Sequence, residues 1–200
     1  VYEPDELVKP RARFIPAGVD LVLGEIDRVD ADANSVRLAD GRELGYDYLV
    51  IATGTSPRPD QTPGMAEGEW HKSIFDFYTL DGAIALRDRL ESWDGGRLVV
   101  HVVEMPIKCP VAPLEFAFLA DAFFAERGMR DRVEIIYVTP MEGAFTQPVA
   151  SRHLGGMLVE RKIAIEGDFM VDRVDPDART LVSMDEREVP FDLLVTVPLN

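Results

Sequence analysis

The sequence has a single cysteine and few basic residues for its length. Its 200 residues contain 21 Lys and Arg against 36 Asp and Glu, which gives a formal net charge of -15. That charge argues against binding to nucleic acid, which requires clustered Lys and Arg, and against binding to an anionic membrane surface. A lone cysteine, Cys109, excludes a disulfide within the chain and fits a reducing compartment.

Long apolar runs and a leader sequence are also missing. No segment of membrane-spanning length is apolar throughout, and no signal peptide is recognisable. No spacing of His, Cys, Asp and Glu indicates a metal site. The chain starts at Val1 rather than at Met and stops at Asn200, directly after an apolar strand. We therefore interpret it as a soluble piece of a longer protein, with length enough for one or two domains.

The segment with the strongest fold signal is Arg97–Gly128, and it contains no glycine before Gly128. The short β-branched run Leu98–Val103 predicts a strand buried on both faces, and a helix is predicted from Pro113 to Gly128. A strand, a tight loop and a helix open a βαβ unit of the nucleotide-binding type. A dinucleotide pyrophosphate needs glycine in that loop, and none occurs between Val103 and Gly128.

In place of glycine the loop presents a thiol. Cys109 precedes the helix N-terminus and has Lys108 beside it, and both features favour the nucleophilic thiolate. The alternative is a small buried apolar residue, which is the commoner role of a free cysteine. Glu115, in the first helical turn, is a second catalytic candidate that could handle protons or could serve only as a charge favourable to the helix.

An internal repeat joins the two ends of the chain. Residues 26–53, IDRVDADANSVRLADGRELGYDYLVIAT, align without a gap with residues 171–198, VDRVDPDARTLVSMDEREVPFDLLVTVP, at a shift of 171 − 26 = 145 residues. Acids and arginines in the turns match as well as apolar positions, which alternation alone does not explain. The second copy completes a βαβαβ unit with a meander, whereas the first copy is only the tail of such a unit.

The predicted fold class is therefore α/β. We expect a three-layer Rossmann-like domain of the FAD/NAD(P)-binding type, with a parallel sheet and a β-meander, preceded by a β-rich remnant of a first such domain. Residues 1–64 form that remnant with its linker, and residues 65–200 form the second domain with the Cys109 loop. A strand buried on both faces is predicted over Glu43–Ala52, and we expect another chain or the second domain to cover its apolar edge, which allows a homo-oligomer.

Two stretches resemble a known family. Residues 46–64, YDYLVIATGTSPRPDQTPG, resemble the end of the FAD domain in flavoproteins with two dinucleotide-binding domains, in which Ala52, Thr53 and Gly54 match the turn near the flavin nucleotide. Residues 105–121, MPIKCPVAPLEFAFLAD, together with YVTP and LLVTVP further on, resemble sulfide:quinone oxidoreductase. The resemblance covers essentially the whole chain, as an internal fragment.

The resemblance implies a flavin-dependent enzyme that oxidises sulfide to sulfane sulfur or polysulfide and passes the electrons through FAD to a quinone. Cys109 matches the redox cysteine that lies against the flavin and carries sulfur. The partner cysteine would lie beyond Asn200 and the glycine-rich FAD loop before Val1, so we expect this chain alone to bind no FAD and to have no turnover. The resemblance also implies a peripheral membrane protein on the cytoplasmic side, docked through a C-terminal region outside this chain.

Other functions remain open from the sequence. A flavocytochrome c-type sulfide dehydrogenase would use a similar cysteine but pass electrons to haem. An NAD(P)H-dependent flavin disulfide reductase or a type II NADH dehydrogenase has the same double fold, although the latter would need glycines after Val103. A non-enzymatic folded interaction domain is a further alternative.

Overall fold

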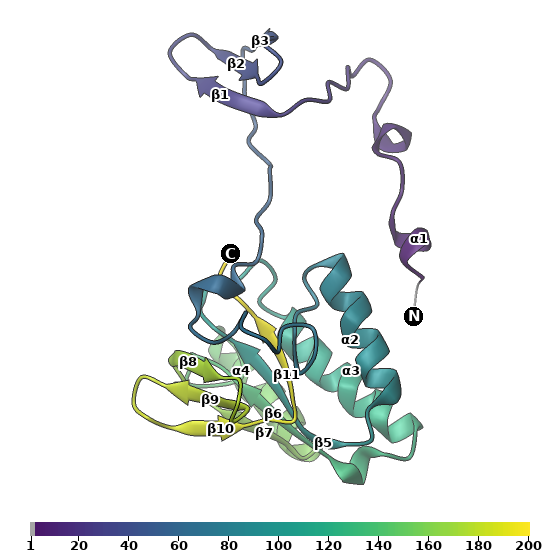
Figure 1. Ribbon diagram of the computed structural model, residues 1–200, viewed down its shortest axis with the longest axis vertical. Helices are drawn as coiled ribbons and strands as arrows, with labels where there is room; N and C mark the ends of the chain where they lie inside the picture. The colour runs from purple at the N-terminus through teal and green to yellow at the C-terminus, as the bar shows by residue number, and fades with distance from the viewer. Residues whose placement is uncertain (1–2) are drawn as a thin grey trace. The chain divides into compact units, whose positions relative to one another are not determined.

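The computed structural model describes residues 3–200 and divides the chain into two compact units, of which the first ends at Gly54 and the second is Thr55–Asn200 (Figure 1). Residues 55–64, assigned above to the linker, are grouped with the second unit. This segment includes the short 3₁₀ helix η2 (Pro59–Gln61), and its Arg58 backbone N–H donates to the carbonyl of Leu199 at 2.6 Å.

A five-stranded parallel sheet is the centre of the second unit. Its order is β4 (Ile74–Phe75), β11 (Leu193–Val197), β5 (Gly96–Val102), β6 (Val133–Val138) and β7 (Ile163–Glu166). Every neighbouring pair is parallel. All residues of β11 are buried, because this strand has neighbours on both edges and apolar layers on both faces.

Helices cover one face of this sheet and a meander covers the other (Figure 1). The helical layer consists of α2 (Leu80–Ser92), α3 (Ala112–Glu126) and α4 (Pro148–Glu160), and the meander of β8 (Val171–Asp175), β9 (Thr180–Ser183) and β10 (Glu188–Pro190). Side chains alternate along β5, so that Leu98 and Val100 pack towards the helices while Val99 packs towards the meander. The three-layer α/β fold predicted from the sequence is confirmed.

Local sequence signals set the ends of the helices around the central loop. Thr79 is the N-cap of α2, and its hydroxyl accepts from the Gly82 backbone N–H at 3.0 Å. Helix α3 begins at Ala112, so Pro113 takes its second rather than its first position. Gly128 lies just after α3 with φ +66°, the left-handed backbone that ends a helix. The short 3₁₀ helix η3 (Arg130–Arg132) then leads into β6.

The first unit contains an antiparallel sheet of three short strands, β1 (Ile26–Asp30), β2 (Ser35–Leu38) and β3 (Glu43–Gly45). Two short helices precede it, α1 (Pro4–Leu7) and the 3₁₀ helix η1 (Arg11–Phe14). Few of the apolar side chains of this unit are buried; Val36 and Leu38 of β2 are the two among the described residues.

The internal repeat extends to the geometry of the backbone. The pairs of β1 with β2 recur between β8 and β9 with 145 added to each number, and the bulge after Ile26 recurs after Val171. The turns match as well, since Asn34 and Arg179 both have φ +50°. The repeat is therefore confirmed as two copies of one folded motif, with equivalent positions 145 residues apart.

The strand predicted over Glu43–Ala52 is wrong after Gly45. Residues 46–54 form no strand, and Val50 and Ile51 are 85% and 71% exposed. Their counterparts in the repeat are Val195 and Thr196 of β11, both with 0% exposure. The physical reason is the absence of neighbours: β11 lies between β4 and β5, and the described part of the first unit holds no parallel strand for residues 48–52 to join. Whether another chain covers this segment stays a prediction.

Two strand boundaries are set by the tertiary structure. Strand β1 begins only at Ile26, although the apolar residues start earlier in the chain. Residues 189–197 are divided between β10 and β11, because the chain crosses from the meander to the parallel sheet there. Asp192 lies in this crossing segment, and its carboxylate accepts a hydrogen bond from the Arg97 backbone N–H at 2.7 Å.

The repeat provides a matched pair of substitutions for measuring stability. Val195→Lys places an ammonium group in the fully buried centre of the sheet, and we expect it to reduce the free energy of unfolding by more than about 3 kcal/mol. Val50→Lys, at the equivalent and exposed position, should change it by less than about 0.5 kcal/mol. Urea unfolding followed by circular dichroism distinguishes the two; equal effects would contradict the exposure of residues 48–52.

Candidate functional site

The loop between β5 and α3 lies at the carboxyl end of a central parallel strand. In α/β sheets of this kind, ligand sites form outside the carboxyl ends of the strands. The loop contains Cys109, a partly exposed residue with a free thiol, between the buried Ile107 and the start of α3. The predicted catalytic cysteine therefore lies at the edge of the sheet where ligand sites form, and its catalytic role stays a prediction.

The backbone of Cys109 is held from two sides. Its carbonyl accepts a hydrogen bond from the N–H of Ala112 at 3.1 Å, which closes the turn into α3. The same carbonyl accepts a second hydrogen bond from the hydroxyl of Tyr78 at 3.0 Å, from a residue 31 positions earlier in the chain. The loop is thus tied both to its own helix and to the segment that precedes α2.

Tyr78 is held in turn by a buried carboxylate. Asp76 is 1% exposed, and its Oδ1 accepts from the backbone N–H groups of Tyr78 at 2.8 Å and Thr79 at 2.7 Å. The ring of Phe77 stacks on Tyr78 and also on Phe116 of α3, with centroids 5.1 and 5.2 Å apart. The segment before α2 is therefore packed against the helix that follows the Cys109 loop.

The electrostatic environment of Tyr78 includes the cysteine. Burial raises the pKa of Tyr78 above its usual 10.0, and a negative charge on Cys109 raises it further, while the hydrogen bond to the Cys109 backbone lowers it. The hydroxyl consequently stays protonated, and able to donate, through the neutral range. Lys108 places its Nζ 5.8 Å from the centroid of the Tyr78 ring, so a cation, a phenol and a thiol share this end of the loop.

A small cavity adjoins the loop at the carboxyl end of β11. It is lined by Thr55, Pro57, Tyr78, Lys108, Val197, Pro198 and Asn200. Thr55 donates from its hydroxyl to the side-chain oxygen of Asn200 at 2.9 Å. The predicted cofactor-binding residues Ala52, Thr53 and Gly54 belong to the first unit and are all exposed.

Glu115 is exposed in the first turn of α3. Within residues 3–200, its side chain makes no hydrogen bond or ion pair. Its position agrees with a charge that favours the N-terminal end of the helix, and its catalytic role stays a prediction. Tyr78 and Asp76 were missed in the sequence, because no motif spacing connects them to a loop about thirty residues later. The one available signal was their place at the start of α2.

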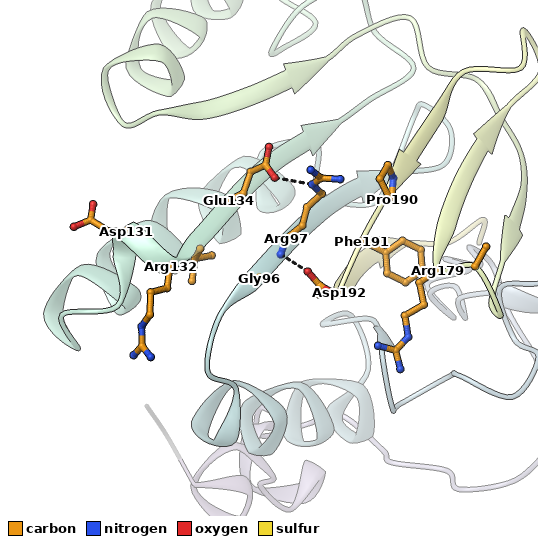
Figure 2. A pocket seen from close by; sticks show the side chains of 11 residues that line it. Gly96, Arg97, Asp131, Arg132, Glu134, Arg179, Pro190, Phe191 and Asp192 are labelled. Carbon is orange, nitrogen blue, oxygen red and sulfur yellow. Dashed lines mark hydrogen bonds and ion pairs between the residues drawn. The ribbon is translucent and has the colours of Figure 1, made fainter.

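A wider groove in the second unit lies at the other end of the sheet (Figure 2). This groove of ≈ 640 Å³ is lined by the amino-terminal ends of β5 and β6 and by the crossing into β11. Arg97 lines it, and its Nε donates to a carboxylate oxygen of Glu134 at 2.6 Å. The backbone N–H of Arg97 donates to the carboxylate of Asp192. The groove is lined by no cysteine, serine, threonine or histidine and lies away from the carboxyl ends of the strands, so it is not the candidate site.

The three histidines have different environments. His101 of β5 is fully buried, with its Nδ1 3.0 Å from the hydroxyl of Thr196 and no partner for its Nε2. Burial lowers the pKa of His101 to about 3. His71 stacks between Trp70 and Phe75, and His153 is exposed on α4. Among the hydrogen bonds, ion pairs and ring contacts of residues 3–200, none joins any of the three histidines to the Cys109 loop.

Within residues 3–200, no three or more His, Cys, Asp or Glu side chains are grouped so that they could hold a metal ion. No helix in that range has the length and apolar character needed to cross a bilayer.

Comparisons with known proteins find this chain similar to several oxidoreductases. Residues 3–100 match the family of pyridine nucleotide-disulphide oxidoreductases. The mitochondrial sulfide:quinone oxidoreductase of Mus musculus is 24% identical over 96% of this chain and 44% of its own length. An NADH dehydrogenase-like protein of Mycobacterium tuberculosis is 30% identical over 84% of this chain and 42% of its own length.

The fold comparison agrees. The crystal structure of the sulfide:quinone oxidoreductase of Aquifex aeolicus superimposes with a TM-score of 0.71 at 22% identity, covering 88% of this chain and 41% of that chain. The chain thus spans less than half the length of the relatives it matches. These matches confirm the resemblance predicted from the sequence, and the solved structure confirms the fold.

The burial of His101 predicts how the stability of the fold depends on pH. Its pKa of about 3 in the folded chain is below the value of 6.5 expected when unfolded, so protons bind the unfolded state more tightly. Stability is therefore retained above pH 6.5 and lost as the pH falls towards 3, by about 1.4 kcal/mol per pH unit from this group. Urea unfolding at several pH values should show a shallower acid loss for His101→Asn than for the parent. His153→Asn, on the surface, should keep the parent slope, and an unchanged slope in His101→Asn would contradict the account.

Proposed function

Because this chain is related to the pyridine nucleotide-disulphide oxidoreductases, we propose that it is part of a flavin-dependent enzyme that oxidises sulfide to sulfane sulfur and passes the electrons to a quinone. The proposal depends on one observation above the others: the loop at the carboxyl end of β5 presents the partly exposed thiol of Cys109 where a dinucleotide-binding loop would present glycines. Sulfide and quinone are proposed as the substrates of the whole protein.

Cys109 is proposed as the residue that takes up and carries sulfur. A thiolate is the nucleophilic form of cysteine, and a nearby cation together with a helix N-terminus favours it. Lys108 and the first turn of α3 supply those two features. In the proposed enzyme, Glu115 is a surface acid of that first turn that could exchange protons with solvent.

The residues present agree with the FAD expected in the whole protein. Gly54 has φ +75° and nothing within 4 Å of the place where a side chain would begin, so its backbone leaves room for a cofactor to approach. Ala52, Thr53 and Gly54 would contribute the crossover side of the FAD site. When bound, FAD supplies the two-electron acceptor that a sulfur nucleophile cannot supply by itself.

The first unit is proposed as the tail of the domain that holds FAD. Its sheet has the register of the meander in the second unit, and its segment 48–52 corresponds to the central strand β11. In the second unit the equivalent apolar residues are buried against a parallel sheet. We expect residues 48–52 to join a sheet of the same kind in the whole protein.

A nicotinamide-dependent dehydrogenase is the alternative suggested by the Mycobacterium tuberculosis relative. Binding a pyrophosphate after β5 would require free backbone N–H groups, and the two prolines of the loop, Pro106 and Pro110, have no N–H to donate. The loop therefore favours sulfur chemistry over binding of NADH at this position.

Replacement of the thiol tests the proposal in the whole flavin-loaded protein. Cys109→Ser should reduce sulfide-dependent reduction of a soluble quinone to the background rate, because the hydroxyl cannot carry sulfane sulfur. The flavin absorbance should be retained, which shows that the fold and cofactor site are intact. Ser151→Ala, on α4, provides a control at a distance. Sulfide-dependent turnover that survives Cys109→Ser, or efficient turnover with NADH alone, would contradict the proposal.

A further inference from the structure

Resting on the proposed function, we propose that Tyr78 is a positioning residue for Cys109. Its hydroxyl donates to the Cys109 carbonyl at 3.0 Å and thereby fixes the backbone from which the sulfur projects. Tyr78 acts through the peptide group and does not itself react with sulfur. The inference goes beyond the assignment of the cysteine, because it identifies what holds that cysteine in place.

The loop has few other anchors. Residues 104–111 include Pro106 and Pro110, which lack a backbone N–H and cannot donate. Apart from the turn and helix that follow it, Tyr78 is the one group in the described part of the chain that hydrogen-bonds to residues 104–111. The bond to Ala112 fixes the loop only with respect to α3, which directly continues it. The bond to Tyr78 fixes it with respect to a segment that is distant in sequence.

Tyr78 is itself well fixed, as a positioning residue must be. The buried Asp76 holds its backbone N–H, and Phe77 packs its ring on one side. Phe77 also stacks on Phe116 of α3, at an interplanar angle of 14°. Tyr78, which donates the hydrogen bond, and α3, which follows Cys109, are therefore parts of one packed cluster. This packing fixes the position of the Tyr78 hydroxyl relative to the loop.

A single isotopic label reports the bond directly. Because Cys109 is the only cysteine of the 200-residue chain, labelling with [1-¹³C]cysteine marks one carbonyl in the whole chain. Its ¹³C chemical shift and its isotope-edited infrared band both respond to the number of hydrogen bonds accepted. We expect both signals to move to those of a more weakly bonded carbonyl in Tyr78→Phe, and to stay unchanged in Tyr48→Phe, which removes a hydroxyl that is on a 95% exposed residue.

The effect on the sulfur is measured by the rate of alkylation with iodoacetamide between pH 6 and 9. We expect Tyr78→Phe to change the rate at Cys109 by about five-fold, the factor that corresponds to one hydrogen bond of ordinary strength. Thermal unfolding should remain cooperative, and Tyr48→Phe should alkylate at the parent rate. A merely structural role for Tyr78 predicts a lower melting temperature with no change in the alkylation rate of the folded chain.

The outcomes separate this inference from the proposed function. An unchanged carbonyl signal in Tyr78→Phe, or an alkylation rate equal to that of the parent while the chain is folded, would overturn the positioning role. If Tyr78→Phe does not fold, the labelled parent still decides, since a carbonyl signal typical of one hydrogen bond rather than two would overturn it. If Cys109→Ser keeps sulfide-dependent turnover, the proposed function fails, but these spectroscopic results on Tyr78 are unaffected.

Discussion

Burial of apolar strands between two neighbours is the constraint on which this structure depends. Strand β11 pairs with β4 on one side and with β5 on the other, and all its residues are buried. Because β5 and β11 are parallel neighbours, their carboxyl ends lie side by side. The Cys109 loop follows the first and Pro198 to Asn200 follow the second, so they border the same small cavity with Thr55. The position of the proposed chemistry is therefore a consequence of how the sheet is packed.

The two copies of the repeat show the effect of this constraint with and without a parallel sheet to join. Both copies form the same antiparallel motif, with the same register and the same bulge, because those features are encoded by short-range pairing and turn residues. They differ after the third strand of the motif. Residues 193–197 have a sheet to enter and form β11, whereas residues 48–52 have equally apolar sequence and remain exposed and without strand structure. An apolar run therefore forms a buried strand only where neighbouring strands are present to pair with it.

This contrast explains how far prediction from sequence could go. The buried strand, the glycine-free loop and the helix around Cys109 were predictable within one or two residues, because each has a local signal in β-branching, proline or capping. The repeat was also predictable. The state of residues 46–52 was not, because it depends on neighbours that the local pattern does not describe. The Tyr78 contact was not predictable either, since it comes from tertiary packing that brings the start of α2 to the loop.

The central claim is that Cys109 is an accessible nucleophilic thiol able to carry sulfane sulfur. The most direct measurement is the intact mass of the folded 200-residue chain after brief exposure to inorganic tetrasulfide, followed by mapping of the modified peptide. The account predicts addition of sulfur to the peptide containing Cys109 in the folded chain, and none in Cys109→Ser. Sulfur addition that occurs only after the chain is unfolded in urea would contradict it, because the thiol would then be an inaccessible packing residue.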